Sequence, residues 1–350
     1  MAKKKNNRAA LRRTLITLSV VLGLILAAMV AGTVYAEYLL GKVNYVDKQE
    51  TMPTLSMEEI DAILNETEPM DEEFTGPVLN EEDVVLETAP AMEEVSDNVA
   101  TILLLGVDRR KNETARTDAI ILCTLNKTQK TITLTSLLRD MYIRIPGYKS
   151  NRINAAYALG GTSLLRETLE YNFGIQVDGC VEVDFAHFES LIDLLGGIEL
   201  ELTSAEANYI TKETGKRVKS GVQLLTGEQA LWYSRFRGTA AGDLARTGRQ
   251  RVVLTTLLNE YKNKSMTELI GLLDDILPIV TTDLTQGEIL GYATDFFPML
   301  ATAEIQSKRI PLEGTYKGAM ISGMSVFTFD VLPNAEELQN IMSEFPKGVG

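Results

Sequence analysis

Thr101-Ile-Leu-Leu-Leu-Gly106 begins a segment, residues 101–140, around which the rest of the chain is predicted to fold. This run and Ala119-Ile-Ile-Leu-Cys-Thr-Leu125 are short and apolar, as strands buried on both faces are. A third, β-branched strand, residues 131–138, runs directly into Arg139-Asp140. Arginines and aspartates therefore collect at predicted strand ends, where open α/β sheets bind ligands. Carboxylates hold hard cations and guanidinium groups hold phosphate oxygens, so the pattern favours a site for a metal-bound phosphate.

The amino terminus has the pattern of a membrane anchor. Residues 1–13 carry six basic residues and no acid, and residues 15–36 then run for 22 residues without a charge. As a helix this segment would span about 33 Å, enough to cross a bilayer. The basic flank places residues 1–14 in the cytoplasm and the rest of the chain outside the cell. A cleaved signal peptide is the alternative, although its apolar core is usually shorter.

Residues 37–97 are predicted to be a flexible acidic stalk. Between Asp47 and Asp97 there are seventeen acids, one base and four prolines. Low hydrophobicity with high charge does not offset the entropy lost on ordering, although residues 57–64 have the pattern of a short helix. The remainder, residues 98–350, is nearly neutral and is expected to be extracellular, which argues against a nucleic-acid binder.

Residues 98–350 alternate between strand-like and helix-like segments, which predicts α/β layers. Besides the three strands already named, we expect strands at 181–185, 198–202, 308–311 and 325–330. We expect helices at 153–161, 162–173, 185–195, 226–233, 246–263, 266–280 and 286–300, and a last helix capped by Asn334.

The composition excludes several chemistries. His187 is the only histidine, and it lies off the apolar stripe of its predicted helix, so a histidine-based triad has little support. Cys123 and Cys180 lack the spacing of zinc ligands, and they could equally form a disulfide or remain buried thiols. There is no Walker-type loop and no dinucleotide fingerprint. Metal-assisted phosphate chemistry remains.

Several arginines stand at the ends of predicted elements, where an anion site is a better interpretation than plain surface charge: Arg116, Arg139, Arg235 and Arg237. An extended segment points residues two apart in the same direction, which applies to Arg235 with Arg237 and to Arg116 with Asp118. Arg246 and Gln250 lie four apart on one face of a helix expected to begin there, and its amino-terminal dipole favours an anion.

Eight segments, in this order, resemble the LytR–CpsA–Psr family of membrane-anchored cell-wall proteins. They are Ile102-Leu-Leu-Leu-Gly-Val-Asp-Arg109, Arg116-Thr-Asp-Ala-Ile-Ile121, Ser136-Leu-Leu-Arg-Asp140, Arg152-Ile-Asn-Ala-Ala-Tyr-Ala-Leu-Gly-Gly161, Val181-Glu-Val-Asp-Phe185, Leu225-Thr-Gly-Glu-Gln-Ala230, Tyr233-Ser-Arg-Phe-Arg237 and Arg246-Thr-Gly-Arg-Gln-Arg251. They cover about residues 100–260, and the residues after them read as a carboxy-terminal extension. One departure is Leu137-Leu138, since the family usually has a proline just before this arginine.

The resemblance implies a central mixed β-sheet with helices on both faces. It implies a phosphotransferase that moves an anionic glycopolymer, such as teichoic acid or capsule, from a polyprenyl (undecaprenyl-type) diphosphate carrier onto peptidoglycan. It implies Mg²⁺ held by Asp108 and Asp118, and an apolar tunnel for the polyprenyl chain. The implied diphosphate contacts are Arg116, Arg139, Arg235, Arg237, Arg246 and Gln250; of these, Arg139, Arg235 and Arg237 join the two aspartates as catalytic residues.

Two other functions fit the same residues. A hydrolase that cuts the lipid diphosphate with water would use the same site. A non-catalytic polyprenyl-phosphate-binding regulator of the cell envelope is the other alternative, although a cytoplasmic part of about 14 residues disfavours direct contact with DNA.

Overall fold

The computed structural model describes residues 35–47, 55–66, 76–92, 96–108, 116–238, 242–262, 264 and 266–346. The chain divides into a short unit, residues 1–43, and a large unit, residues 44–350. In the short unit, residues 35–40 are helical. The predicted membrane segment, 15–36, lies almost wholly outside the described residues, and no helix within them is long and apolar enough to span a bilayer.

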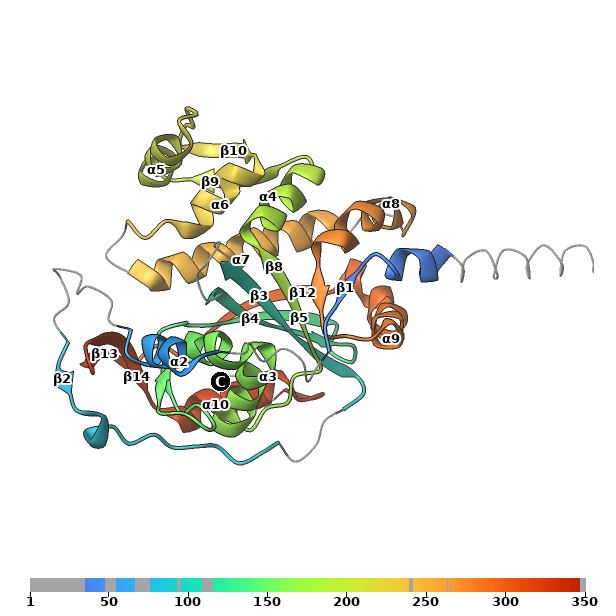
Figure 1. The fold of residues 1–350 in the computed structure, drawn as a ribbon. Helices are drawn as coiled ribbons and strands as arrows, with labels where there is room; N and C mark the ends of the chain where they lie inside the picture. Colours follow the sequence, from blue (N-terminus) through green and yellow to red (C-terminus); the bar gives the residue numbers. More distant parts are fainter. Residues whose placement is uncertain are drawn as a thin grey trace, which may run out of the picture. The chain divides into compact units, whose positions relative to one another are not determined.

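A mixed sheet of seven strands forms the centre of the large unit (Figure 1). In spatial order the strands are β1 (Asn44–Tyr45), β11 (Thr281–Thr282), β8 (Gly179–Asp184), β3 (Val99–Asp108), β4 (Arg116–Asn126), β5 (Thr131–Leu137) and β12 (Glu304–Ile310). β4 runs antiparallel to both β3 and β5, whereas β8 is parallel to β3 and β12 is parallel to β5. The three strands predicted between residues 101 and 138 are therefore neighbours in the sheet.

Helices cover both faces of this sheet, as predicted (Figure 1). On one face lie α3 (Ile153–Phe173) and α10 (Val331–Ile341), and on the other lie α7 (Gly242–Tyr261) and α9 (Gln286–Phe296). In β4, Leu122 belongs to the first core and Cys123 packs against the second, because successive side chains of a strand point to opposite faces.

The glycine pair predicted to separate two helices has that role. Gly160 and Gly161 are non-helical within α3, and Gly161 has a φ of 61°, which favours glycine. The second half of α3 ends at Gly174 in the left-handed conformation, with φ 65°. The buried first half thus runs into a second half with a different direction on the sheet.

The residues between β8 and α7 in sequence form a smaller layer with a third hydrophobic core. It contains α4 (Phe185–Leu194), β9 (Ile198–Leu202), α5 (Ser204–Thr214), β10 (Gly221–Leu225) and α6 (Gly227–Arg235), and β9 and β10 pair antiparallel. Ile192, Ile198 and Ile210 are each fully buried there, and Val253 of α7 joins them. This core fixes α6, whose last residue is Arg235, to α7.

The carboxy-terminal residues complete the domain rather than extend it. β12 pairs with β5 along seven residues, so it is longer than the predicted 308–311. β13 (Tyr316–Ile321), which the sequence analysis missed, pairs with β14 (Met324–Phe329) and with β2 (Val78–Leu79). The remaining elements are β6 (Tyr142–Ile143) paired with β7 (Asn151–Arg152), α8 (Met266–Ile276), η1 (Glu81–Asp83), η2 (Leu277–Ile279) and η3 (Phe297–Thr302).

The last helix begins at Val331, so Asn334 is not its cap. Asn334 is fully buried; its amide donates to the carbonyl oxygen of Asp330 at 2.6 Å, and its Oδ1 accepts from the backbone N–H of Leu312 at 2.7 Å. An asparagine three residues before a glutamate has the sequence pattern of a cap, but here its side chain ties the helix to the loop after β12.

The prediction of a flexible stalk is wrong for residues 55–66 and 76–92. The helix α2 (Met57–Leu64) begins with a capping box of Ser56 and Glu59, and Ile63 is 6% exposed in the core that contains α3. Val78 and Leu79 add a strand to β13. A few well-placed apolar residues therefore dock a segment whose average composition is that of a disordered chain.

Candidate active site

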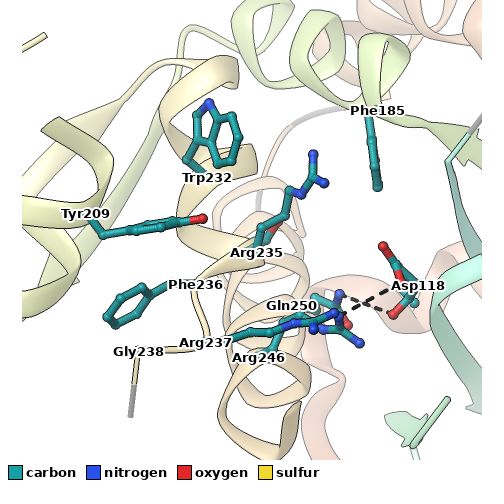
Figure 2. Close-up of a pocket in the computed structure, with 12 residues that line it drawn as sticks. Asp118, Phe185, Tyr209, Trp232, Arg235, Phe236, Arg237, Gly238, Arg246 and Gln250 are labelled. Atoms are coloured by element: carbon teal, nitrogen blue, oxygen red, sulfur yellow. Dashed lines mark hydrogen bonds and ion pairs between the residues drawn. The ribbon is translucent and has the colours of Figure 1, made fainter. Parts of the chain in front are cut away.

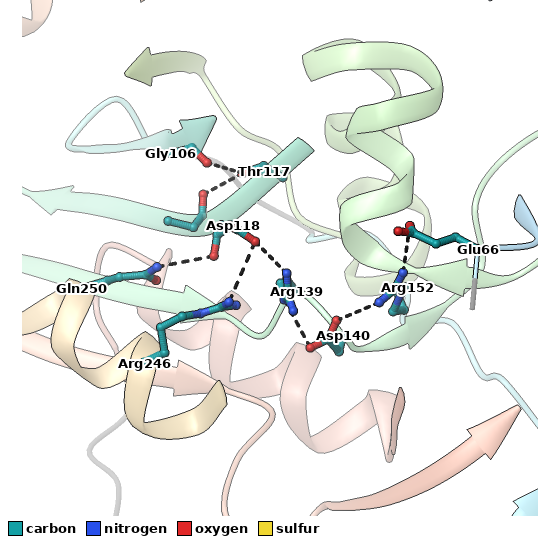
Figure 3. A network of polar contacts seen from close by, with 10 residues as sticks. Glu66, Gly106, Thr117, Asp118, Arg139, Asp140, Arg152, Arg246 and Gln250 are labelled. Carbon is teal, nitrogen blue, oxygen red and sulfur yellow. Dashed lines mark hydrogen bonds and ion pairs between the residues drawn. The ribbon is translucent and has the colours of Figure 1, made fainter. Parts of the chain in front are cut away.

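A β-bulge directs Asp118 into the site. Pairing of β3 with β4 shifts so that Ala119 lies opposite Gly106 and Thr117 opposite Val107, which leaves Asp118 as the extra residue. Thr117 Oγ1 lies within donor distance of the carbonyl oxygens of Gly106 (3.2 Å) and Ala119 (2.8 Å), which stabilises the bulge (Figure 3). Asp118 and Ala119 both line one cavity, as consecutive residues of a regular strand would not.

Asp118 is surrounded by cationic side chains. Arg139 donates to Asp118 Oδ1 at 2.7 Å, and Arg246 Nη1 lies 3.9 Å from the same oxygen. Burial alone raises the pKa of Asp118, but the charges of Arg139, Arg246 and Arg237 outweigh it and hold that pKa below the usual value. The carboxylate is therefore ionised at neutral pH, and it balances part of the positive charge around it.

The ion pairs continue away from the cavity (Figure 3). Arg139 Nε lies 3.3 Å from Asp140 Oδ2, and Asp140 Oδ1 lies 3.6 Å from Arg152 Nη1. Arg152 Nη2 donates to Glu66 Oε2 at 3.1 Å. Acidic and basic groups thus alternate from Asp118 to the segment that carries α2.

The end of α6 carries two of the predicted arginines. A capping box of Thr226 and Gln229 begins this helix, as predicted, and Arg235 is its last residue. The guanidinium group of Arg235 lies 4.8 Å from the ring centroid of Phe185 and 5.2 Å from that of Trp232. Arg237 is exposed two residues later.

Arg246 and Gln250 lie on one face of α7, as their spacing predicts. Arg246 is 3% exposed, and Gln250 Nε2 donates to the backbone carbonyl oxygen of Asp118 at 3.5 Å. The predicted contribution of the helix dipole is not found, because α7 begins at Gly242 and Arg246 lies a full turn inside it. The dipole acts mainly within the first turn.

These residues enclose a cavity of about 540 Å³ (Figure 2). It is lined by Asp118, Ala119, Phe185, Tyr209, Trp232, Ser234, Arg235, Phe236, Arg237, Gly238, Arg246 and Gln250. Charged side chains and aromatic rings from α4, α5 and α6 therefore line the same cavity. The combination suits an anionic ligand that also carries a ring or an apolar group.

Three of the predicted site residues are not among those that line the cavity: Arg139, Asp108 and Arg116. Arg139 contacts the cavity through Asp118 rather than lining it. Asp108 ends β3, partly buried, and since it lies two residues after Gly106 it is on the same face as Ala119, the cavity face. Arg116, the first residue of β4, is opposite Asp108, but its side chain lies outside the described part of the chain.

Asp108 and Asp118, on neighbouring strands, are the residues that could hold a metal ion. Within the described residues, no group of three or more His, Cys, Asp or Glu side chains could hold a metal. Mg²⁺ usually keeps several waters and takes one or two carboxylates together with phosphates of the substrate. Asp118, held ionised by its neighbours, has the hard oxygen ligands that this ion prefers.

The side chains set aside by the sequence analysis remain outside the site. His187 is on the first turn of α4, with a side chain 43% exposed and Nδ1 3.1 Å from Asp184 Oδ2. Cys123 and Cys180 are free thiols, so they do not form the possible disulfide. Burial raises the pKa of Cys123 to about 12, which makes a thiolate nucleophile unfavourable.

The aromatic rings that line the cavity and the far end of the ion-pair series were not predicted from the sequence. Phe185, Tyr209, Trp232 and Phe236 come from three helices and a loop, with no spacing that joins them. Trp232 is the only tryptophan of the chain and stands three residues before Arg235, which was the one available signal. Glu66 lies in the segment that was taken as a stalk.

Comparison with known proteins identifies relatives of this chain. A model of the LytR_cpsA_psr family matches residues 68–344. Regulatory protein MsrR of Staphylococcus aureus (strain COL) is 32% identical over 248 residues, which are 70% of this chain and 69% of that protein. The polyisoprenyl-teichoic acid–peptidoglycan teichoic acid transferase TagT of Bacillus subtilis (strain 168) is 33% identical over 259 residues, which are 71% of this chain and 77% of that protein.

Solved structures share the fold. The crystal structure of B. subtilis TagT superposes with a TM-score of 0.57 at 27% identity, covering 73% of this chain and 99% of that one. The structure of the LytR-CPS2A-psr family protein YwtF (TagT) with bound octaprenyl pyrophosphate lipid gives a TM-score of 0.56 at 27% identity, covering 73% and 96%.

Proposed function

Because the chain belongs to the LytR–CpsA–Psr family, we propose that it is a phosphotransferase that moves an anionic glycopolymer from a polyprenyl diphosphate carrier onto peptidoglycan. The observation that carries the proposal is the cavity that Arg235, Arg237 and Arg246 line together with the ionised Asp118. The relative YwtF (TagT) has a solved structure with bound octaprenyl pyrophosphate lipid, and TagT is a teichoic acid transferase by name.

The proposed reaction exchanges one phosphorus–oxygen bond for another. A hydroxyl oxygen of the peptidoglycan glycan attacks the phosphorus that carries the polymer, and the bond from that phosphorus to the bridging oxygen breaks. Polyprenyl phosphate leaves with the bridging oxygen, and the hydroxyl proton is released. Phosphoryl transfer of this kind depends on positioning and on neutralised charge, which the arginines provide.

We propose Mg²⁺ as the cofactor, held by Asp108 and Asp118, where it would supply positive charge to the diphosphate oxygens. The lowered pKa of Asp118 favours this ligand role over that of a general base, because a weakly basic carboxylate accepts a proton poorly. Arg116, Arg139 and Gln250 complete the proposed diphosphate site. Arg235 is the residue we expect to contribute most, since the rings beside it set the plane of its guanidinium group.

For location, we propose that residues 15–36 anchor the chain in the cell membrane, with residues 1–14 in the cytoplasm and the catalytic domain outside. The basic flank and the uncharged run support this orientation. Protease added outside intact cells should then degrade the domain, and complete protection would contradict the orientation.

The experiment that tests the function supplies a polyprenyl-diphosphate-linked polymer, peptidoglycan and Mg²⁺ to the purified chain. We expect polymer joined to the glycan through a phosphodiester, together with polyprenyl monophosphate, detected by mass spectrometry. Phosphorylated polymer released into solution, with none on the glycan, would instead identify the lipid-diphosphate hydrolase.

A regulatory function is the second candidate, because one relative is named regulatory protein MsrR. A purely regulatory role predicts lipid binding with neither transfer nor hydrolysis. The same assay therefore separates all three functions.

A further inference from the structure

We propose that Glu66 is a positioning residue for the diphosphate site, although it lies before the strands that build that site. It also lies outside residues 68–344, which match the family. The inference rests on the proposed function for the identity of the ligand. Its basis is the ion-pair series that links Glu66 to Asp118 (Figure 3).

The end of α2 is held in place by Lys149 and by Asn151 of β7. Asn151 Nδ2 donates to the carbonyl oxygen of Leu64 at 3.1 Å, and Lys149 Nζ donates to Asn65 Oδ1 at 3.2 Å. Ile63, one turn earlier, is buried in the main core. Glu66 therefore follows two fixed residues, and its position beside Arg152 is part of the fold.

Arg152 is a buried cation between two acids. Its side chain is 4% exposed, and those of Asp140 and Glu66 are 13% and 25% exposed. A buried guanidinium group needs compensating charge, since desolvation of an unbalanced ion is costly. Glu66 provides the shorter contact, at 3.1 Å, and Asp140 the longer, at 3.6 Å.

Within the described part of the chain, Asp140 forms ion pairs with both Arg152 and Arg139. Its Oδ2 lies 3.3 Å from Arg139 Nε, and that contact leaves Arg139 Nη1 directed at Asp118. While Glu66 balances the charge of Arg152, Asp140 orients Arg139. Without the charge of Glu66, Arg152 draws Asp140 toward itself, and Arg139 loses the partner that fixes its plane.

An opposite effect also exists, because removal of any negative charge makes the protein more attractive to an anion. This effect should be small at Glu66, since Arg152, Asp140 and Arg139 separate it from the cavity and part of its side chain is solvated. The loss of orientation at Arg139 should therefore outweigh the gain in attraction, so Glu66→Gln should weaken diphosphate binding.

The test measures farnesyl diphosphate affinity by titration calorimetry on the purified full chain with Mg²⁺ present. Glu66→Gln keeps the shape of the side chain and an acceptor for Arg152, so the fold should hold, which a melting curve checks. We expect the dissociation constant to rise about three- to tenfold. In an Arg139→Lys background, Glu66→Gln should add no further loss, because its effect passes through Arg139.

Asp61→Asn is the matched control, since Asp61 is an exposed acid of the same helix, and it should bind like the unmodified chain. Unchanged or tighter binding by Glu66→Gln overturns the inference, as does an equal loss in the Arg139→Lys background, which a merely structural role would give. Failure of the unmodified chain to bind farnesyl diphosphate overturns the proposed diphosphate site, and this inference with it.

Discussion

Two groups of arginines, one connected to Asp118 by ion pairs and one lining the cavity, are held in different ways. Arg139 and Arg152 lie between carboxylates, with side chains only 10% and 4% exposed. Arg235 lies over the rings of Phe185 and Trp232. A carboxylate balances the charge of its arginine before any ligand arrives, whereas an aromatic ring orients the arginine and leaves its net charge in place.

The difference assigns the two groups separate tasks. The carboxylate-held arginines fix the geometry of the strand ends, and their loss should affect both folding and activity. The ring-held arginine supplies attraction for an anion, and its loss should affect activity alone. Substitutions in the two groups of arginines therefore test whether the groups differ in this way.

The largest effect is expected from Arg235→Lys. Lysine keeps the charge but cannot form two parallel hydrogen bonds to a phosphate or stack as a plane between rings. We expect the transfer rate to fall by more than about tenfold, given that charge-assisted contacts contribute about 1.5–3 kcal/mol each. The melting temperature should not change. Arg144→Lys, at an exposed arginine, is the control and should remain fully active.

Arg139→Lys should lower both the transfer activity and the stability of the fold. It removes the fork that joins Asp118 to Asp140, so transfer should again fall by more than about tenfold. Unlike Arg235→Lys, it should also lower the free energy of unfolding by about 1–3 kcal/mol, because buried carboxylates lose hydrogen bonds. Chemical denaturation of the two variants measures the contrast. Equal stability of both would remove the distinction between the two groups.

The docking of α2 is tested by Ile63→Ala. Truncation of a buried isoleucine costs about 2–4 kcal/mol, so the midpoint of urea unfolding should fall clearly. Met57→Ala is the matched control on the same helix, since Met57 is 74% exposed, and it should change little. Were both variants equally stable, residues 55–66 would be a solvated stalk after all.

A smaller effect, on stability in acid, is expected from Glu206 of α5, the helix that also carries Tyr209. Burial alone raises the pKa of Glu206, but hydrogen bonds from Thr203 and Arg249 outweigh it and hold that pKa below the usual 4.5. A lowered folded pKa stabilises the protein above about pH 4.5, and the stabilisation is lost as the pH falls through the folded value.

Glu206→Gln should therefore flatten the loss of stability below about pH 4.5, measured by urea unfolding at several pH values. Arg249, the partner of Glu206, also donates to the carbonyl oxygen of Phe236 at 3.0 Å, so this pair supports the segment between Arg235 and Arg237. Glu201→Gln, at an exposed acid, should lose stability in acid as the unmodified chain does. The same loss in Glu206→Gln would show that the pair of Glu206 and Arg249 adds no acid-sensitive stability.

Much of the fold could be predicted from local patterns. Apolar runs predicted the three strands between 101 and 138, glycines predicted the break at Gly160 and Gly161, and the capping box at Thr226 predicted the start of α6. The docking of α2 could not be predicted, because Ile63 and its apolar neighbours are few among acids and only tertiary packing reveals their partners.

The candidate site was predictable where chemistry follows motif spacing. Asp118, Arg235, Arg237, Arg246 and Gln250 all line the cavity, as the predicted anion site requires. The bulge at Asp118 and the rings of Phe185 and Tyr209 depend on strand pairing and on helix packing, which no local pattern records. The dipole contribution to Arg246 was wrong because α7 begins one turn earlier than its apolar periodicity suggests.

The cavity between Asp118 and Trp232 is proposed to bind a polyprenyl diphosphate. Because Trp232 is the only tryptophan in the chain and lines that cavity, its fluorescence reports on the cavity alone. Titration with farnesyl diphosphate in the presence of Mg²⁺ should change this fluorescence saturably, and Arg235→Lys should weaken the apparent affinity more than about tenfold. Binding seen by calorimetry without a change in tryptophan fluorescence, or with the same affinity in Arg235→Lys, would contradict the claim.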